Sequence, residues 1–412
     1  MDVKSDKYIL GQSTSKTISN QSEIRLDLSL ETNTTQLLLG PQYDSFTIAS
    51  QGYIPPIEIN ATKGILGGSA SIAPNGQFVQ GLGVSFAAEV NIIIYTMAAG
   101  QYNLNIKYLS GDRNSTLLIN VAGAGTGVTY NFPKTTNWDV SSASISTVSL
   151  NLPKGRVLIK FFNNYGNASP WIGDLTFALQ QTPTVESINA NTGTMSGGTH
   201  VVDNGYVGAI GDTGGYVTVP INITKAGIYT LGIRYISGDR DRIMKVDVNG
   251  VWTGTTYTFL KTTNWNESNS RVFDVTVTLN QGTNKIKFYN SPNSPAPWIG
   301  PLTFTQQFFY TTIEAENTTL TGTAKVNNGL VSGIGYGLGS ITFGISNLPG
   351  IGQYSFIIKY VSSTSGKTAR LWVNNIQIGG NHTFEVTDDW DQFKYKTITI
   401  PLNLNNNIIK IS

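Results

Sequence analysis

The sequence YNLNIKY at Tyr102–Tyr108 decides the fold that this chain is expected to adopt. Aromatic and aliphatic side chains alternate with polar ones along it, which is the pattern of a half-buried β-strand. The pattern Y-x-(L/F)-x-I-x-Y returns at Tyr229–Tyr235 and again at Tyr354–Tyr360. The three copies predict three modules, each built around this strand.

Longer identities fix the period of the repeat. The offset between the first two Tyr strands is 235 − 108 = 127, and the offset to the third is 360 − 235 = 125. A period this long indicates duplicated domains and not a solenoid. The first offset also relates three identical pairs of peptides, which are SGDR (110–113 and 237–240), KTTNW (134–138 and 261–265) and PWIG (170–173 and 297–300).

The other apolar segments fall into the same columns and predict short strands, with no helical period. They are separated by Gly-, Asn- and Pro-rich turns, as in an all-β sandwich. The late strand of each module is expected at Val148–Leu152, Val275–Leu279 and Ile400–Leu404, and Trp138, Trp265 and Trp390 are expected to align. The predicted domains are a non-repeat β segment (1–54) and three sandwich modules (55–182, 183–308 and 309–412).

The two ends of the chain do not fit the repeat. Residues 1–54 contain alternating stretches such as IRLDLSL and TQLLLG, which are interpreted as the tail of an upstream domain. Module 3 ends at Ile411, which aligns with Ile286, so its last strand, the counterpart of PWIGPLTF, is missing. A sandwich without a strand exposes backbone groups and core side chains. Either the chain is a fragment, or this strand comes from elsewhere.

Composition excludes several functions. The 27 basic and 25 acidic residues give a net charge of +2, and no basic cluster predicts a nucleic-acid partner. There is no cysteine and no apolar run long enough to span a membrane. The N-terminus lacks the features of a signal peptide, so the chain is expected to be a mature protein or a piece of one.

No catalytic motif is present, so the chain is predicted not to be an enzyme. The two histidines, His200 and His382, lie in different modules, and His382 stands where the other copies have Tyr130 and Tyr257. No pair of carboxylates recurs between the repeats, as a duplicated acid/base site would require. Tandem sandwiches with Trp, Asn and Arg in their loops are instead suited to binding sugars, because indole faces stack on pyranose rings and tandem copies raise avidity.

The order of motifs resembles carbohydrate-binding module families 6 and 35. It runs (E/N)-A-(E/N), NG-x-V-x-x-(I/L)-G, AG-x-Y-x-L-x-I-(R/K)-Y, V-x-V-N-G, T-x-x-W and P-x-I over residues 55–412, with IEAENTTLTG and AGIYTLGIRYISG as the best matches. The resemblance implies a jelly-roll sandwich, a glycan site on the loops at one end, and in many members a structural calcium ion.

The family's calcium ligands are acidic residues of the opening and last strands. Module 3 keeps Glu314 and Glu316, so a Ca²⁺ ion is predicted in that module only. Modules 1 and 2 have neutral residues at these positions, which balance a hard dication poorly. These residues are Asn60, Thr62, Asn189 and Asn191, with Gly173 and Gly300 in the last strand.

The candidate ligand-binding residues lie in the loops of modules 1 and 2. Trp138 and Trp265 match one aromatic of the family's sugar clamp, and Tyr206 or Phe78 would have to swing in to face them. For KTTNW two hypotheses stay open, a one-sided sugar platform or a plug of the sandwich core. In SGDR the arginine either braces a turn beside its aspartate or reaches the ligand. The polar candidates are Arg113, Arg240, Asn163 and Asn290.

Three functions are compatible with this sequence. The favoured hypothesis is a non-catalytic receptor-binding region of a secreted bacterial toxin that recognises a cell-surface glycan or glycoprotein. This plan is similar to the binding components of binary toxins of the vegetative insecticidal type, which carry an upstream oligomerising domain. The alternatives are the polysaccharide-binding tail of a secreted glycoside hydrolase and an adhesive spacer.

Overall fold

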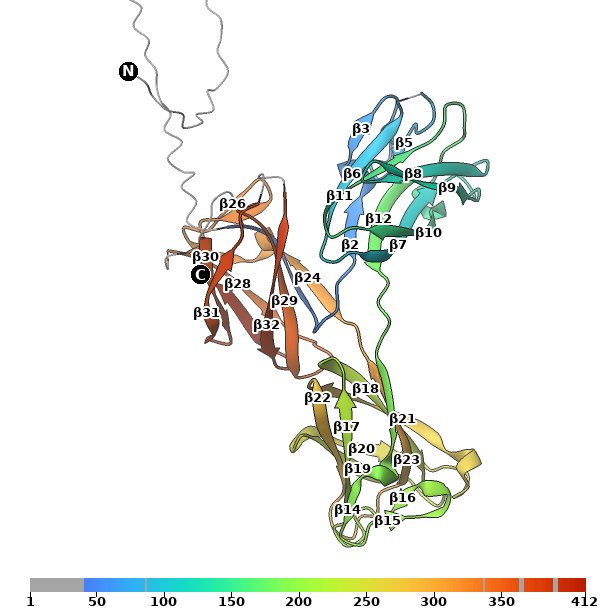
Figure 1. The fold of residues 1–412 in the computed structure, drawn as a ribbon, viewed down its shortest axis with the longest axis vertical. Helices are drawn as coiled ribbons and strands as arrows, with labels where there is room; N and C mark the ends of the chain where they lie inside the picture. Colours follow the sequence, from blue (N-terminus) through green and yellow to red (C-terminus); the bar gives the residue numbers. More distant parts are fainter. Residues whose placement is uncertain (1–40, 86, 336–337, 363–366, 388–391) are drawn as a thin grey trace, which may run out of the picture. The chain divides into compact units, whose positions relative to one another are not determined.

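The computed structural model describes residues 41–85, 87–335, 338–362, 367–387 and 392–412 (Figure 1). Its strands form six antiparallel sheets, two in each of three sandwich modules. The helical segments among the described residues are 3-10 turns of three residues. The predicted all-β fold is therefore confirmed. The stretches IRLDLSL and TQLLLG lie outside the described residues.

Module 1 packs a six-stranded sheet on a five-stranded sheet. Alternate side chains of the central strand β7, including Tyr102, Leu104 and Ile106, are buried in the core between them. The first sheet contains β2 (Ile57–Asn60), β4 (Ser71–Ile72), β5 (Val79–Gln80), β7 (Gly100–Leu109), β10 (Ser144–Leu152) and β12 (Trp171–Leu179). The second contains β3 (Ile65–Gly67), β6 (Glu89–Thr96), β8 (Ser115–Val121), β9 (Ala124–Phe132) and β11 (Gly155–Phe162). The 3-10 turns are η2 (Ala61–Lys63) and η3 (Val140–Ser142).

Module 2 repeats this arrangement around β18, whose Tyr229, Leu231 and Ile233 are buried. The six-stranded sheet contains β13 (Val185–Asn189), β15 (His200–Val201), β16 (Val207–Gly208), β18 (Gly227–Ile236), β21 (Arg271–Leu279) and β23 (Trp298–Gln306). The five-stranded sheet contains β14 (Thr194–Ser196), β17 (Tyr216–Ile223), β19 (Arg242–Val248), β20 (Val251–Phe259) and β22 (Gly282–Tyr289). The 3-10 turns are η4 (Ala190–Thr192), η5 (Asp203–Gly205) and η6 (Glu267–Asn269).

Module 3 also has a six-stranded and a five-stranded sheet, although its own segment is one strand short. The first sheet contains β1 (Gln42–Ser50), β24 (Tyr310–Glu314), β26 (Lys325–Asn327), β27 (Leu330–Ser332), β29 (Gly352–Val361) and β32 (Lys394–Leu402). The second contains β25 (Thr319–Gly322), β28 (Gly339–Ile345), β30 (Lys367–Val373), β31 (Ile376–Phe384) and β33 (Asn407–Ile411). The 3-10 turn is η7 (Ala315–Asn317).

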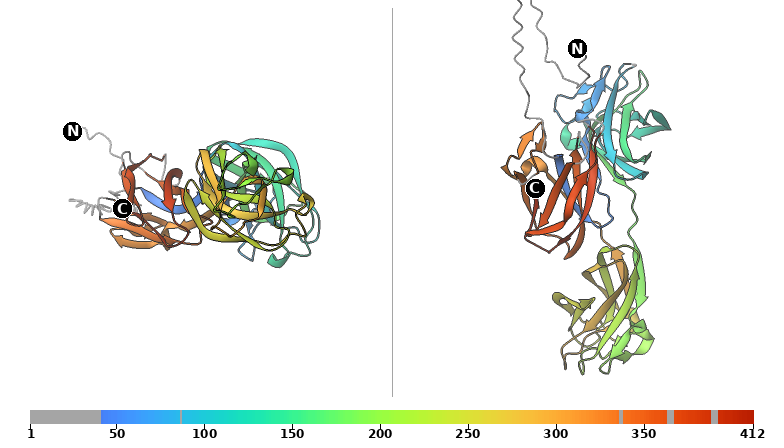
Figure 2. Two further views of the ribbon diagram at one scale, coloured as in Figure 1. Left: turned by 90° about the horizontal axis from the view of Figure 1, so that it is seen from below. Right: turned by 60° about the vertical axis from the view of Figure 1, so that its left-hand side comes forward.

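The missing strand of module 3 is β1, which comes from the other end of the chain. It pairs antiparallel with β24 on one side and with β29 on the other. Phe46 lies opposite Ile358, just as Leu302 lies opposite Ile233 in module 2. In Figures 1 and 2 this blue strand runs among the orange and red strands of module 3. Modules 1 and 2 are therefore inserted between the last and the first strand of module 3.

This finding corrects the predicted domain boundary at residue 54 and the prediction that module 3 lacks its last strand. The sequence signal was present but weak. PQYDSFTI at 41–48 shares a proline, a threonine and the apolar spacing with PWIGDLTF at 170–177 and PWIGPLTF at 297–304. A search along the order of the chain does not find it, because the strand precedes the modules that separate it from its partners.

The late strand of module 3 is also shifted from its predicted register. Leu402 lies opposite Gly352, as Leu152 lies opposite Gly100 in module 1. The equivalent of Val148–Leu152 is thus 398–402 and not Ile400–Leu404, and Leu404 is exposed. Trp390, expected to align with Trp138 and Trp265, lies outside the described residues.

Candidate functional site

Four loops meet at one end of module 1, and this region is called its loop end. They are 81–85, 110–114, 133–139 and 163–170, and backbone hydrogen bonds tie them together. Gly166 N donates to Gly83 O over 3.0 Å, and Thr116 N donates to Ala168 O over 2.9 Å. The loop end of module 2 contains the corresponding loops, 127 or 128 residues later in the chain.

The three repeated peptides converge at the loop end. The indole of Trp138 packs on that of Trp171, with 4.7 Å between ring centroids. Gly111 lies against the Trp138 ring, since a Cβ there would be 2.1 Å from Nε1. In module 2 Trp265 packs on Trp298 at 4.5 Å. SGDR, KTTNW and PWIG therefore supply the glycine and the two indoles of one packing unit.

The first threonine of KTTNW also has a structural role. Thr135 Oγ1 accepts a hydrogen bond from Ser110 N at 3.1 Å and donates to Asn137 O at 2.8 Å. Thr262 makes the same pair of bonds with Ser237 N and Asn264 O in module 2. Because both threonines are buried, they fix the KTTNW loop to the SGDR loop. This geometry favours the packing hypothesis for KTTNW, with Trp138 and Trp265 half-buried.

The two loop ends differ beside the tryptophan pair. In module 2 the guanidinium carbon of Arg242 lies 5.1 Å from the Trp265 ring centroid. The same guanidinium binds Asp239 at 2.9 Å. Module 1 has Ser115 at the equivalent position, where it hydrogen-bonds to Ser110 at 2.7 Å. Among the described residues, no guanidinium lies over the Trp138 ring as Arg242 lies over Trp265.

Asn163 and Asn290 hold the loops together from within. Both side chains are about 5% exposed. The amide of Asn163 donates to Thr116 O at 2.7 Å and to Ala168 O at 3.2 Å. Asn290 donates to Ile243 O and to Ser294 O, each at 2.8 Å. Their amide donors are therefore engaged by backbone carbonyls, and the structure gives both residues a role in positioning the loops.

Arg113 and Arg240 are the predicted residues that reach solvent, with side chains 66% and 61% exposed. Arg113 pairs with the adjacent Asp112 at 2.7 Å, an exposed contact that stabilises little. Tyr165, which sequence reasoning missed, is 59% exposed in the same loop end. The repeat could not reveal this residue, because module 2 has Pro292 at the equivalent position.

Tyr206 and Phe78 are core side chains, and Trp138 and Trp171 pack against the cluster that contains Phe78. The Tyr206 and Phe78 rings are buried, with at most 1% exposure. Tyr206 lies over Gly300, where a Cβ would meet its ring at 2.8 Å, and Phe78 covers Gly173 in the same way at 2.9 Å. The glycine of each PWIG peptide thus makes room for an aromatic plug. The prediction that Tyr206 swings toward the ligand is corrected to a core position.

In module 1, the residues that match the calcium position of the resembled families form hydrogen bonds and an ion pair with one another. Asn60 Oδ1 accepts from Thr62 N at 2.9 Å and so caps the 3-10 turn. Its Nδ2 donates to Asp174 at 2.7 Å, and the Lys107 ammonium lies 3.1 Å from the same carboxylate. Hydrogen bonds from these two side chains lower the pKa of Asp174. An internal amide and an internal ammonium therefore both bind this carboxylate.

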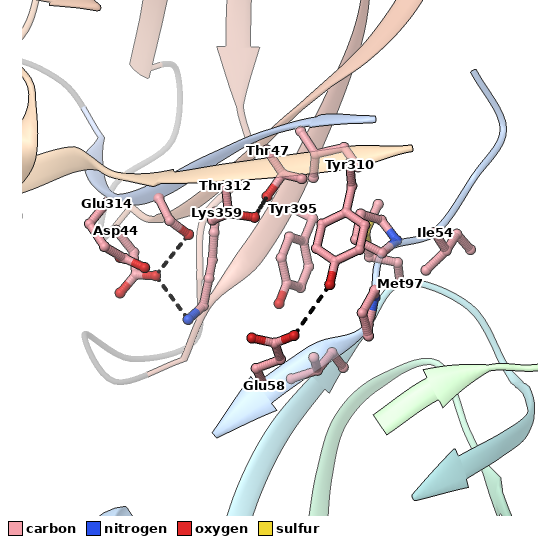
Figure 3. Close-up of a pocket in the computed structure, with 15 residues that line it drawn as sticks. Asp44, Thr47, Ile54, Glu58, Met97, Tyr310, Thr312, Glu314, Lys359 and Tyr395 are labelled. Atoms are coloured by element: carbon pink, nitrogen blue, oxygen red, sulfur yellow. Dashed lines mark hydrogen bonds and ion pairs between the residues drawn. The ribbon is translucent and has the colours of Figure 1, made fainter. Parts of the chain in front are cut away.

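Module 3 gathers more negative charge at the corresponding place. Figure 3 shows Asp44 of β1 near Glu314 of β24, with the Lys359 ammonium 2.9 Å from Asp44. Burial, with the charges of Asp44 and Glu316, raises the pKa of Glu314. Thr47 and Thr312 share a hydrogen bond of 2.9 Å in the same sheet. Among the described residues, no group of three carboxylate or imidazole side chains converges closely enough to hold a metal ion.

Comparison with known proteins places this chain beside carbohydrate-active proteins. No family model matches it. A 1,6-alpha-glucosyltransferase of Sporosarcina globispora is 27% identical over 227 residues, 53% of this chain and 17% of that protein. The chain thus spans about a sixth of the length of this curated relative.

Two solved structures are similar in part. A family 35 carbohydrate-binding module from Clostridium thermocellum is 26% identical and matches 30% of this chain and 99% of that one, with a TM-score of 0.27. The cycloalternan-forming enzyme from Listeria monocytogenes is 16% identical and matches 56% and 20% of the two chains, with a TM-score of 0.26. In the described part of the chain, no helix is long and apolar enough to cross a membrane.

Proposed function

We propose that this chain is a non-catalytic glycan-binding region, with its sites at the loop ends of modules 1 and 2. The observation that carries the proposal is the convergence of three repeated peptides into one rigid loop end beside exposed arginines. Rigid loops that present aromatic and polar groups reduce the entropy lost on binding. Two copies on one chain raise the avidity for a repeating polymer.

The curated relative favours a carbohydrate-active enzyme as the setting, in preference to a toxin. Its name describes the transfer of glucosyl groups with 1,6-alpha linkage, so the proposed ligand is a neutral alpha-glucan with such linkages. The chain would then be a binding tail of a larger secreted bacterial protein. The toxin hypothesis includes a glycoprotein receptor and an upstream oligomerising domain. No contact among the described residues supports it.

Affinity electrophoresis in dextran gels tests the glycan site. The parent chain is expected to be retarded by dextran, and Arg113→Ala and Tyr165→Ala to weaken this retardation. Arg156→Ala is the matched control, because this exposed arginine lies at the opposite end of β11 from the loop end. Migration of the parent chain that dextran does not change would contradict the proposed function.

Two further parts of the proposal have their own tests. The chain is proposed to leave isomalto-oligosaccharides unchanged, which chromatography after long incubation checks. A Ca²⁺ ion is proposed at Glu314 and Glu316 of module 3, where carboxylate oxygens suit this cation. Calorimetric titration with Ca²⁺ should give one binding event that Glu314→Gln removes. Equal binding by parent and variant would place any calcium elsewhere.

A further inference from the structure

The outer face of the five-stranded sheet in module 2 carries a cluster of aromatic and charged side chains. The register places them in two adjacent rows across four strands. Tyr216 of β17 lies opposite Tyr289 of β22, which lies opposite Lys245 of β19. In the next row Lys287 lies opposite Asp247, and Asp247 lies opposite Trp252 of β20. This set of six residues is called the sheet-face cluster.

Positive charge dominates the sheet-face cluster. The Lys287 ammonium lies 4.1 Å from the Tyr216 ring centroid and 5.0 Å from that of Tyr289. Neither Lys287 nor Lys245 forms a salt bridge among the described residues, and Asp247 is the single carboxylate of the cluster. Two unpaired ammonium groups on an aromatic surface attract an anionic group.

Asp247 and Trp252 complete the cluster, and the Trp252 indole donates to Thr255 O at 3.3 Å. One carboxylate oxygen of Asp247 is buried and accepts no hydrogen bond in the described part of the chain. The Trp252 side chain is 49% exposed, although indoles are mostly buried in folded proteins. Burial and a hydrogen bond to Asp247 raise the pKa of Tyr289 to about 12, so its hydroxyl keeps its proton.

Module 1 has the same sheet but no such cluster. Its Lys160 occupies the position of Lys287, and Glu89, at the position of Tyr216, forms a salt bridge with it. Asn91 also donates to Glu89 at 2.8 Å. Gly125 stands opposite Asn120, where module 2 has Trp252 opposite Asp247. The ammonium of module 1 is therefore neutralised by a carboxylate, whereas Lys287 of module 2 lies on tyrosine rings and forms no salt bridge among the described residues.

We propose that the sheet-face cluster of module 2 binds an anionic saccharide, separately from the loop ends. The acidic group of the sugar lies against Lys287 and Lys245, and one pyranose face stacks on Trp252. Carboxylate–ammonium contacts of this kind supply charge-assisted hydrogen bonds, and the indole supplies the apolar face. This site does not depend on the neutral glucan proposed for the loop ends.

Calorimetric titration of the full chain with a glucuronate-containing oligosaccharide tests this site. The parent is expected to bind, and Lys287→Gln and Trp252→Ala are each expected to weaken binding about tenfold or more, as loss of a charge-assisted bond or a stacking face does. Lys160→Gln, at the equivalent position in module 1, should leave the affinity unchanged. Thermal melts of each variant check that it folds, and binding should weaken further when salt is raised.

Each outcome decides between the sites. A parent that does not bind the glucuronate probe, or an equal loss in Lys160→Gln and Lys287→Gln, would overturn the sheet-face site. Loss of this binding in Tyr165→Ala with none in Trp252→Ala would assign it to the loop end instead. Retardation by dextran, measured on the same variants, reports on the loop ends alone. The failure of one proposal is therefore visible without the failure of the other.

Discussion

The replacement Phe46→Ala tests whether the N-terminal strand β1 is an integral part of the C-terminal module. Phe46 is 1% exposed in the core of module 3. Its ring stacks on Phe343 and Phe356, with centroid distances of 5.2 and 5.7 Å. Truncating a fully buried phenylalanine removes its burial and leaves a cavity, and this costs about 3–5 kcal/mol. Module 3 should lose this amount of stability, although its other strands lie more than 260 residues along the chain.

Hydrogen exchange measured by peptide mass spectrometry resolves the modules separately. Amides of β28 and β29 exchange through opening of module 3, and amides of β17 report on module 2. A loss of 3–5 kcal/mol corresponds to exchange about 10² to 10³·⁵ times faster in the module 3 peptides. The module 2 peptides should keep their rate, since Phe46 contributes nothing to the core of module 2.

The matched control is Leu404→Ala, an apolar truncation at an exposed position near the end of the same module. It should change no exchange rate by more than a few-fold. If Phe46→Ala left the β28 and β29 peptides as protected as in the parent, β1 would not be a core strand. The alternative, that module 3 folds without its last strand, would then hold.

Three further predictions concern single side chains. Gly238→Ala should destabilise module 2 by about 1–3 kcal/mol, because the new Cβ would lie 2.6 Å from the Trp265 ring; thermal melts check this against Gly380→Ala, where no atom lies within 4 Å. Asn290→Ala should cost about 1–3 kcal/mol, because two backbone carbonyls lose the donor that joins them, and chemical denaturation measures it. The raised pKa of Glu314 gives a stability contribution that is present below its unfolded pKa and lost as pH rises through the folded value; relative to Glu314→Gln, the parent should therefore gain stability from pH 7 to pH 4, and a constant difference would refute the shift.

The sequence predicted the fold class and the three copies because the evidence for both is local and repeated. Alternation in the Tyr strands needs no tertiary information, and the offset of 127 residues relates identical peptides. The repeats also singled out SGDR, KTTNW and PWIG, and these three peptides do meet at one loop end. It could not give the orientation of their side chains. Whether Trp138 faces solvent or Gly111 depends on how three loops from distant parts of the chain pack.

Other features were hidden for physical reasons. The strand that completes module 3, β1, is far from β24 in the sequence. No short window of the sequence therefore contains both strands. The sheet-face cluster depends on cross-strand register, which places Lys287 beside Asp247 and Trp252 only once the sheet is formed. Tyr206 illustrates the opposite error, because its place next to a loop motif indicated exposure. Tyr206 is buried instead, because Gly300 has no side chain and leaves space for the tyrosine ring.

The placement of β1 follows from how every module closes. First and last strands are antiparallel neighbours in each of them, as β2 and β12 are in module 1 and β13 and β23 are in module 2. The two ends of a folded module therefore lie next to each other, so inserting modules 1 and 2 between the ends of module 3 adds only short connections, 51–56, 180–184 and 307–309. If module 1 unfolds, the loop that holds β1 against β24 becomes about ten times longer. Because each doubling costs about 0.6 kcal/mol, module 3 would lose about 2 kcal/mol. Module 3 is thus weakly coupled to the folding of the modules inserted into it, whereas tandem modules in simple succession would lack this link.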